Sequence, residues 1–214
     1  MKVLVLAPHN DDEVLGVGGT IRNHVLAGDD VVVCEATSGP MYRTLQEEAR
    51  RAHALLGVSE SIFLNLPASK LADIPKIDLN EKIGKVVSDV RPQIVYLPFI
   101  GDMHLDHRYV IEAALVAVRP VNQCPVKKVY MYETLSETGW NVPYGERNFT
   151  PNVWVGITNV IDEKIAAMKC YESQIKDYPN PRSEEGIKAL AMFRGSTVGC
   201  AYAEAFMLVR EIQA

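Results

Sequence analysis

The sequence predicts a single Rossmann-like α/β domain, residues 1–214, with a mostly parallel sheet flanked by helices. Short apolar runs of strand length alternate with longer segments whose apolar residues recur at helical spacing. Glycine and proline punctuate these segments, as they do at turns and helix ends. No repeat or low-complexity tract interrupts the pattern, and 214 residues can bury the core of one domain. Alternating strands and helices are typical of βαβ units, whose strands run parallel.

The first half of the chain supplies four of the predicted strands. The opening run, 2–7, is apolar and ends at Pro8. In the third predicted helix, Asp78 occupies a capping position with Glu81 three residues later, and Pro92 follows the end of the helix. The predicted elements are a strand at 2–7, a helix bearing Val17, Ile21 and Val25 and ending at Gly28, a strand at 30–36, a helix from Leu45 to Gly57, a strand at 61–64, a helix from Asp78 to Val90, and a strand at 93–97.

The second half of the chain continues this pattern and then becomes irregular. A helix through Ile111 and Val118 and a fifth strand at 127–132 are expected first. The segment 133–151 is rich in glycine, asparagine, proline and aromatic residues, which is typical of a functional surface loop. The remaining predicted elements are a strand at 153–157, helices at 159–175 and 184–193, and a strand at 206–209.

Two polar segments follow directly after predicted strands. His9-Asn10-Asp11-Asp12-Glu13 comes after the first strand, and His104-Leu105-Asp106-His107 lies in the loop after the fourth. Sites in open parallel sheets form outside the carboxyl ends of the strands, where the strand order reverses. With the common order 3-2-1-4-5, the first and fourth strands are neighbours at that point. The two segments are therefore expected to meet.

These two segments contain the residue types that a metal hydrolase needs. Two imidazoles and a carboxylate leave one coordination position of zinc open for water, and a further carboxylate can accept the proton of that water. The chain has only five histidines, so a His-x-x-His spacing rarely arises by chance. The sequence predicts a catalytic metal site.

The same segments resemble the motifs of the PIG-L/LmbE-like family of zinc-dependent N-deacetylases, which remove acetyl groups from N-acetylglucosaminyl compounds. The family motifs are Ala-His-Pro-Asp-Asp-Glu after the first strand and His-Pro-Asp-His after the fourth. Here Asn10 and Leu105 replace the two prolines, and Asn10 brings an amide to that position. The resemblance continues through 15–20, 56–58 and 202–206.

The resemblance implies that His9, Asp12 and His107 are metal ligands. The implied cofactor is Zn²⁺, although this N/O donor set also suits Fe²⁺ and other first-row divalent metals. The alternative for these three residues is a polar loop in which Asp12 caps the helix that follows.

The resemblance also implies roles for the neighbouring polar residues. Asp11 would be the general base, and His104 would stabilise the oxyanion and protonate the leaving amine. Both residues could instead orient the ligands. Glu13 and Asp106 are expected to be partners of the histidines rather than catalytic groups.

Substrate contacts are expected outside the motifs. The region 133–194 matches the family only loosely, and in such proteins it would choose the substrate. Arg43, in the loop after the second strand, and Arg194, just before Gly195, are candidates for binding a substrate hydroxyl or carboxylate. A solvated or salt-bridged arginine is the alternative for each.

Other patterns argue for ordinary structural roles. Gly16, Gly18 and Gly19 lack the third glycine of a dinucleotide fingerprint, so close packing of a helix on the sheet is the preferred interpretation. His24 and His53 lie within predicted helices without partners at metal-ligand spacing, and neither is expected to be a ligand.

Composition indicates a protein that acts on small molecules. The net charge of −5 and the lack of a basic stripe indicate no nucleic-acid partner and no anionic membrane surface. The apolar start is far shorter than a signal sequence or a membrane span, so no membrane insertion and a cytoplasmic location are expected. The cysteines, at positions 34, 124, 170 and 200, form no Cys-x-x-Cys pair and are expected to be buried, reduced thiols.

The sequence therefore predicts a metal-dependent hydrolase that removes an N-acetyl group from an amino sugar or an N-acetylglucosaminyl conjugate. Two alternatives remain open. One is a metal amidase or esterase acting on another acyl substrate, and the other is a metal- or nucleotide-binding module without turnover. The apolar, tyrosine-rich late segment is consistent with a homo-oligomer.

Overall fold

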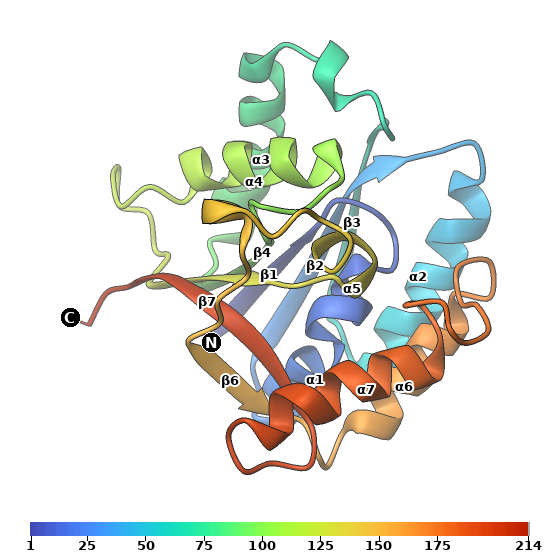
Figure 1. Ribbon diagram of the computed structural model, residues 1–214. Coiled ribbons are helices and arrows are strands. Elements are labelled where there is room, and N and C mark those ends of the chain that lie inside the picture. Colours follow the sequence, from blue (N-terminus) through green and yellow to red (C-terminus); the bar gives the residue numbers. More distant parts are fainter. Residues whose placement is uncertain (214) are drawn as a thin grey trace.

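The computed structural model describes residues 1–213, which form one seven-stranded sheet with helices on both faces (Figure 1). The strand order is β3-β2-β1-β4-β5-β7-β6. The strands are β1 (Lys2–Ala7), β2 (Asp30–Ser38), β3 (Glu60–Pro67), β4 (Ile94–Pro98), β5 (Lys128–Tyr132), β6 (Val153–Gly156) and β7 (Ala203–Glu211).

The predicted strand order 3-2-1-4-5 is confirmed. The first five strands run parallel, and β7 then pairs antiparallel with both β5 and β6. The sheet is therefore mostly parallel, as the sequence indicates. Strands β1 and β4 pair directly, with Val3 opposite Ile94 and Val5 opposite Tyr96. Their carboxyl ends lie side by side.

The helices form two layers (Figure 1). Helices α3 and α4 pack on one face of the sheet, and α1, α2 and α6 pack on the other. The helices are α1 (Asp12–Leu26), α2 (Tyr42–Leu56), α3 (Lys76–Val90), α4 (Leu105–Ala117), α5 (Leu135–Thr138), α6 (Ile161–Cys170) and α7 (Glu184–Ser196), with short 3-10 turns at Leu71–Asp73 and Gly145–Arg147.

Strand β1 shows why the central strands are continuously apolar. Successive side chains of a strand point to opposite faces of the sheet. Val3 and Val5 pack with α1, whereas Leu4 and Leu6 pack toward α3 and α4, and all four are completely buried. Both faces are covered by helices, so neither face of β1 tolerates a polar residue.

The glycines of α1 allow this helix to approach the sheet closely. A Cβ atom at Gly16 would lie 2.2 Å from Tyr132, and one at Gly19 would lie 2.6 Å from Ile157. Both distances are shorter than any normal contact. These glycines therefore serve helix packing, which is the structural interpretation that the sequence favours over a nucleotide-binding loop.

A buried ion pair also holds α1 in place. Lys164 of α6 and Glu204 of β7 lie 2.5 Å apart, and both are nearly inaccessible to solvent. The Lys164 ammonium donates to the carbonyl of Leu15, while the Glu204 carboxylate accepts from the backbone amides of Gly19 and Thr20. These bonds compensate the burial of both charges. They also give a structural role to Glu204, which lies in the segment 202–206 that resembles the family.

Several predicted boundaries differ from the structure. Asp78 is not the cap of α3, because that helix begins at Lys76 after Pro75 and places Asp78 in its first turn. The helix predicted at 159–175 ends at Cys170. The second polar segment lies on the first turn of α4 rather than in a loop. Arg43 likewise lies on α2, which begins before the predicted Leu45.

The expectation that all the cysteines are buried is wrong for three of them. Cys34 is buried in β2, Cys124 and Cys170 are partly exposed, and Cys200 is exposed. All four are unpaired thiols. Among residues 1–213, no helix has both the length and the apolar character needed to cross a membrane.

We predict that Gly16→Ala lowers the free energy of unfolding by about 1–3 kcal/mol, because the added methyl group overpacks a completely buried contact with Tyr132. Gly84→Ala in α3 is the matched control, since a Cβ atom there meets nothing within 4 Å. The control should be neutral or stabilising by up to about 1 kcal/mol. Denaturant unfolding measures both variants, and equal stability of the two would contradict the packing argument.

Candidate active site

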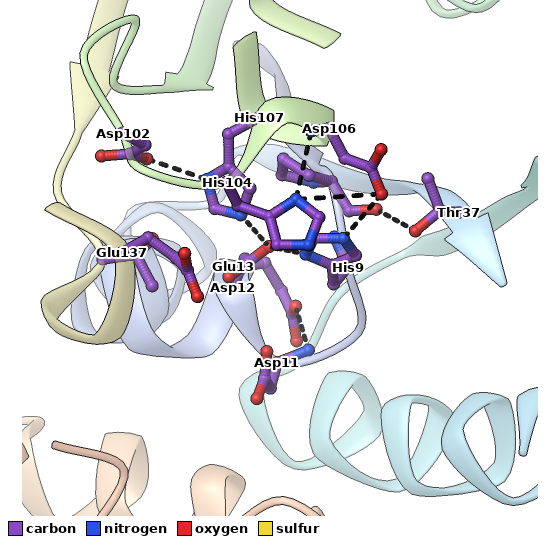
Figure 2. A network of polar contacts seen from close by, with 12 residues as sticks. His9, Asp11, Asp12, Glu13, Thr37, Asp102, His104, Asp106, His107 and Glu137 are labelled. Atoms are coloured by element: carbon purple, nitrogen blue, oxygen red, sulfur yellow. Dashed lines mark hydrogen bonds and ion pairs between the residues drawn. The ribbon is translucent and has the colours of Figure 1, made fainter. Parts of the chain in front are cut away.

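The two polar segments meet at the carboxyl ends of β1 and β4 (Figure 2). The loop after β1 carries His9, and Asp12 opens helix α1. His104 caps α4 by accepting a hydrogen bond from the Asp106 amide, and His107 lies on the first turn of that helix. The parallel pairing of the two strands therefore brings together residues from distant parts of the sequence.

His9, Asp12 and His107 form a compact group of metal-ligand atoms. One donor atom from each residue lies within 4.8 Å of the others. Asp12 Oδ2 is 3.1 Å from His107 Nε2 and 3.4 Å from His9 Nδ1. Asp12 and His107 are completely buried, whereas the His9 side chain is 22% exposed.

Each of these histidines has its other ring nitrogen held by a second carboxylate. His107 Nδ1 lies 2.8 Å from Asp102 Oδ2, and His9 Nε2 lies 3.1 Å from Asp106 Oδ2 (Figure 2). A carboxylate that accepts from one nitrogen of an imidazole fixes its tautomer and directs the other nitrogen toward a metal. The nitrogens that face Asp12 are therefore the ones available for a cation.

The donor set fits a divalent cation. Asp12 Oδ1 is buried and has no hydrogen-bond partner among the described residues. His107 Nε2 is also buried, and its 3.1 Å contact with Asp12 Oδ2 lacks hydrogen-bond geometry. Buried polar atoms without a partner are rare, and each one calls for an explanation. Two imidazoles and one carboxylate are typical ligands of zinc and other first-row metals. A cation shared by these atoms would complete their coordination.

Charge is concentrated strongly at these residues. Burial raises the pKa of Asp12, but His107 and His9 together hold it well below its usual range. Burial lowers the pKa of each histidine, but the neighbouring carboxylates outweigh it and raise the pKa of His9 to about 9 and that of His107 to about 10. The carboxylates thus attract positive charge to the place where a cation would bind.

Asp11 lies next to this group in a strained conformation. Its φ of 108° is in the left-handed region that non-glycine residues rarely adopt, and its amide donates to Glu13 Oε2 at 3.2 Å. The carboxylate is 1% exposed, and Oδ2 lies 3.0 Å from Arg182 Nε. Burial raises the pKa of Asp11 to about 8, although Arg182 lowers it.

His104 lies at the more open side of the site. Its side chain is 31% exposed, and its ring meets the His9 ring edge-on at 4.4 Å. Burial and the neighbouring His9 lower the pKa of His104. His104, His9 and Asp106 form a second group with metal-ligand spacing, but it is more exposed than the group around Asp12.

Asp106 lies where the sequence predicts it, against a histidine of the site, and its Oδ2 also accepts from the Ser69 amide at 2.6 Å. Glu13 differs from the expectation. Its Oε1 accepts from Tyr171 at 2.5 Å and lies 3.3 Å from His53, so its histidine partner is His53 rather than His9.

The expectation that His53 lacks partners at metal-ligand spacing is therefore wrong, because Glu13, Glu35 and His53 also form a buried group with such spacing. The amide of Asn10 does not project into the site. It donates to Glu35 of β2, and this hydrogen bond ties the loop after β1 to the neighbouring strand. His24 contacts Asp29 and Tyr96, away from the site.

Two residues of the site, Asp102 and Arg182, lie outside both motifs and were not predicted from the sequence. Asp102 orients His107 and accepts from the hydroxyl of Thr138 at 2.5 Å. Its position two residues before His104 could have indicated this role. Arg182, which contacts Asp11 and lies 4.0 Å from Glu137, comes from a loop between α6 and α7 that carries no motif.

The two arginines proposed from the sequence make other contacts. Arg43 is exposed, and its Nε contacts the hydroxyl of Tyr42 at 3.1 Å. Arg194 forms a bidentate ion pair with Glu133, in which Nε lies 2.7 Å from Oε1 and Nη2 lies 2.6 Å from Oε2. Within the described part of the chain, neither makes a hydrogen bond or ion pair with the histidines or with Asp11. A role in substrate binding remains a prediction for both.

Comparison with known proteins relates most of the chain to two deacetylases and to one further solved structure. Diacetylchitobiose deacetylase from Thermococcus kodakarensis is 29% identical over 97% of this chain and 83% of its own length. A 1D-myo-inositol 2-acetamido-2-deoxy-alpha-D-glucopyranoside deacetylase from Mycobacterium sp. is 27% identical over 85% of this chain and 77% of its own length. The crystal structure of the conserved protein TT1542 from Thermus thermophilus superposes with a TM-score of 0.80 at 26% identity, covering 99% of this chain and 96% of that one.

A family model provides the assignment. The model described as PIG-L, GlcNAc-PI de-N-acetylase, matches residues 4–118, more than half of the 214 residues, and this range contains both polar segments. The chain belongs to the PIG-L family.

Proposed function

We propose that this protein is a zinc-dependent N-deacetylase that removes the acetyl group from an N-acetylated amino sugar or one of its conjugates. The observation that carries the proposal is the convergence of His9, Asp12 and His107, with buried donor atoms lacking partners, directly beside Asp11. Both deacetylases compared above align over most of this chain, which supports the reaction class.

His9, Asp12 and His107 would hold the metal. Zinc is the preferred occupant, and the same donors would accept Fe²⁺. A divalent cation bound there would acidify a water molecule and polarise the acetyl carbonyl. Asp102 and Asp106 would orient the two imidazoles through their outer nitrogens.

Asp11 is the proposed general base. Its Oδ1 is buried and has no hydrogen-bond partner among the described residues, so it can accept the proton of the attacking water. His104 is the proposed acid. It would donate a hydrogen bond to the developing oxyanion and then transfer a proton to the leaving amine nitrogen. Its 31% exposure supports this role, because an acid for the leaving group must be accessible to a bound substrate.

The substrate would be chosen by the region 133–194 of this single domain, 1–214. This region lies entirely outside the range matched by the family model, and it contributes Glu137 and Arg182 to the surroundings of Asp11. The deacetylase compared from Mycobacterium acts on a 2-acetamido sugar by its name. A small-molecule substrate with such a group is therefore proposed here.

A screen of N-acetylated amino sugars and their conjugates tests the reaction directly. The zinc-loaded protein should release acetate and free amine in equal amounts from at least one of them. Turnover of other acyl amides or of esters, without turnover of any acetamido sugar, would support the rival amidase or esterase. A metal-replete protein that is inert on all acyl compounds would instead support a binding module.

We predict that the purified protein binds about one divalent metal ion per chain, and that His9→Ala, Asp12→Ala or His107→Ala each lowers metal affinity sharply, because a site with three protein ligands cannot lose one. Asp102→Asn should cost about 10–100-fold in affinity, since it disturbs only the orientation of His107. Elemental analysis after dialysis measures occupancy. His24→Ala is the control and should retain its metal. Full occupancy in His107→Ala would contradict the ligand assignment.

We predict that Asp11→Asn keeps its metal but loses ~10²–10⁴-fold in kcat, because the amide has the shape of the carboxylate but cannot accept the proton. Steady-state kinetics and metal analysis of the same preparation measure both effects. Asp89→Asn makes the same chemical change on an exposed face of α3 and should not alter kcat. Near-normal kcat in Asp11→Asn would exclude this residue as the base.

We predict that the two histidines of the second motif have different effects. His107→Ala should empty the metal site, whereas His104→Ala should keep the metal and nearly the same KM while kcat falls about 10²–10³-fold, the typical cost of losing one oxyanion donor. Metal titration and kinetics of the two variants side by side provide the test. Equal loss of metal in both variants would refute the assignment, as would a change confined to KM.

A further inference from the structure

Arg182 is the only cation in contact with Asp11 among the described residues. Its Nε lies 3.0 Å from Asp11 Oδ2, and its side chain is 26% exposed while Asp11 is almost completely buried. We propose that Arg182 is a positioning residue, which holds the Asp11 carboxylate in the orientation needed to accept the proton. This inference rests on the proposed function of Asp11.

The two oxygens of the Asp11 carboxylate have different surroundings. Oδ2 lies 3.0 Å from Arg182 Nε in an ion pair, although this contact lacks hydrogen-bond geometry. Oδ1 is buried, has no hydrogen-bond partner in the described part of the chain, and is not the oxygen nearest to Arg182. A carboxylate can rotate about its Cβ–Cγ bond, so a contact that fixes one oxygen also fixes the direction of the other. Arg182 therefore determines where the free oxygen points.

The backbone of Asp11 is anchored separately. The amide of Asp11 donates to Glu13 Oε2 at 3.2 Å, and the residue has a φ of 108°. A non-glycine residue in this conformation is strained, and it persists only when its surroundings hold it. Glu13 fixes the main chain, and Arg182 fixes the carboxylate. Without Arg182, no charged partner of the side chain would remain among the described residues.

The loop that carries Arg182 is itself well anchored. The amide of Arg182 donates to Asn180 Oδ1 at 2.9 Å, and its carbonyl accepts from the Lys176 amide at 3.3 Å. The next residue, Ser183, is buried and caps α7 by accepting from the Gly186 amide at 3.0 Å. Hydrogen bonds therefore hold the main chain on both sides of Arg182. Its side chain reaches Asp11 from a backbone position that is fixed.

An arginine suits this position better than a lysine. Nη2 of Arg182 also lies 4.0 Å from Glu137 Oε1, so the guanidinium stands between two carboxylates from different elements. The planar guanidinium presents several donors in a fixed geometry, whereas a lysine ammonium is a single charge on a flexible stem. A lysine could approach Asp11 but could not bridge both acids in the same way.

Arg182→Ala and Arg182→Lys test the inference in the zinc-loaded enzyme, with the best acetamido sugar from the screen. Arg182→Ala should keep its metal and its KM within about twofold, while kcat falls roughly 10–100-fold, as expected for misplacement of a catalytic group. Arg182→Lys should be intermediate, and added guanidinium ions should restore part of the kcat of Arg182→Ala. Lys176→Met, in the same loop, is the control and should behave like the wild type.

Three results, two kinetic and one from metal analysis, would overturn the inference. Unchanged or increased kcat in Arg182→Ala would mean that the arginine shields Asp11 but is not needed to orient its carboxylate. A rise in KM at constant kcat would make it a substrate contact, and loss of metal would make it a support of the ligand group.

A crystal structure of Arg182→Ala provides a readout that needs no turnover. The Asp11 carboxylate should adopt a new orientation or more than one, and an unchanged single orientation would refute the inference. An inactive wild type would count against the proposed deacetylase function, whereas an active wild type with an unaffected Arg182→Ala variant would refute only the role of Arg182.

Discussion

The parallel pairing of β1 with β4 is the constraint on which the site depends. The strands align with Leu4 opposite Val95, and both are completely buried, so their register cannot slip without exposing apolar side chains. The loops after these strands must then begin side by side. The histidines of the two motifs converge for this reason, and the sheet order brings them together independently of their polar contacts.

This convergence concentrates buried carboxylates, which is costly unless each charge is compensated. The structure compensates most of them locally. Asp102 and Asp106 bind the outer nitrogens of the histidines, and Asp11 meets Arg182. The buried carboxylate oxygens that stay without a hydrogen-bond partner in the described chain are Asp12 Oδ1 and both oxygens of Asp11, and they belong to a proposed ligand and to the proposed base. Incomplete compensation therefore marks the place where the chemistry is proposed to occur.

The elements that sequence reasoning predicted well are those set by local periodicity or by a motif. Strand β1 and the position of His9 after it follow from a continuous apolar run and a proline. Arg182 could not be predicted, because its contact with Asp11 joins a loop without a motif to the first βα turn. Arg43 and Arg194 were chosen by their positions in the chain, and the structure gives both of them other partners.

The C-terminal part of the chain contributes to the site in a second way, through the helix that presents Asp12. Lys164 and Glu204, both outside the range matched by the family model, hold the backbone of α1 near its glycines. Tyr132 packs against Gly16 and donates to the carbonyl of Leu6, next to the end of β1. Residues 15–20 of α1 are thus held by residues distant in sequence. A change of substrate through this region must preserve those contacts, because they also position the proposed ligands.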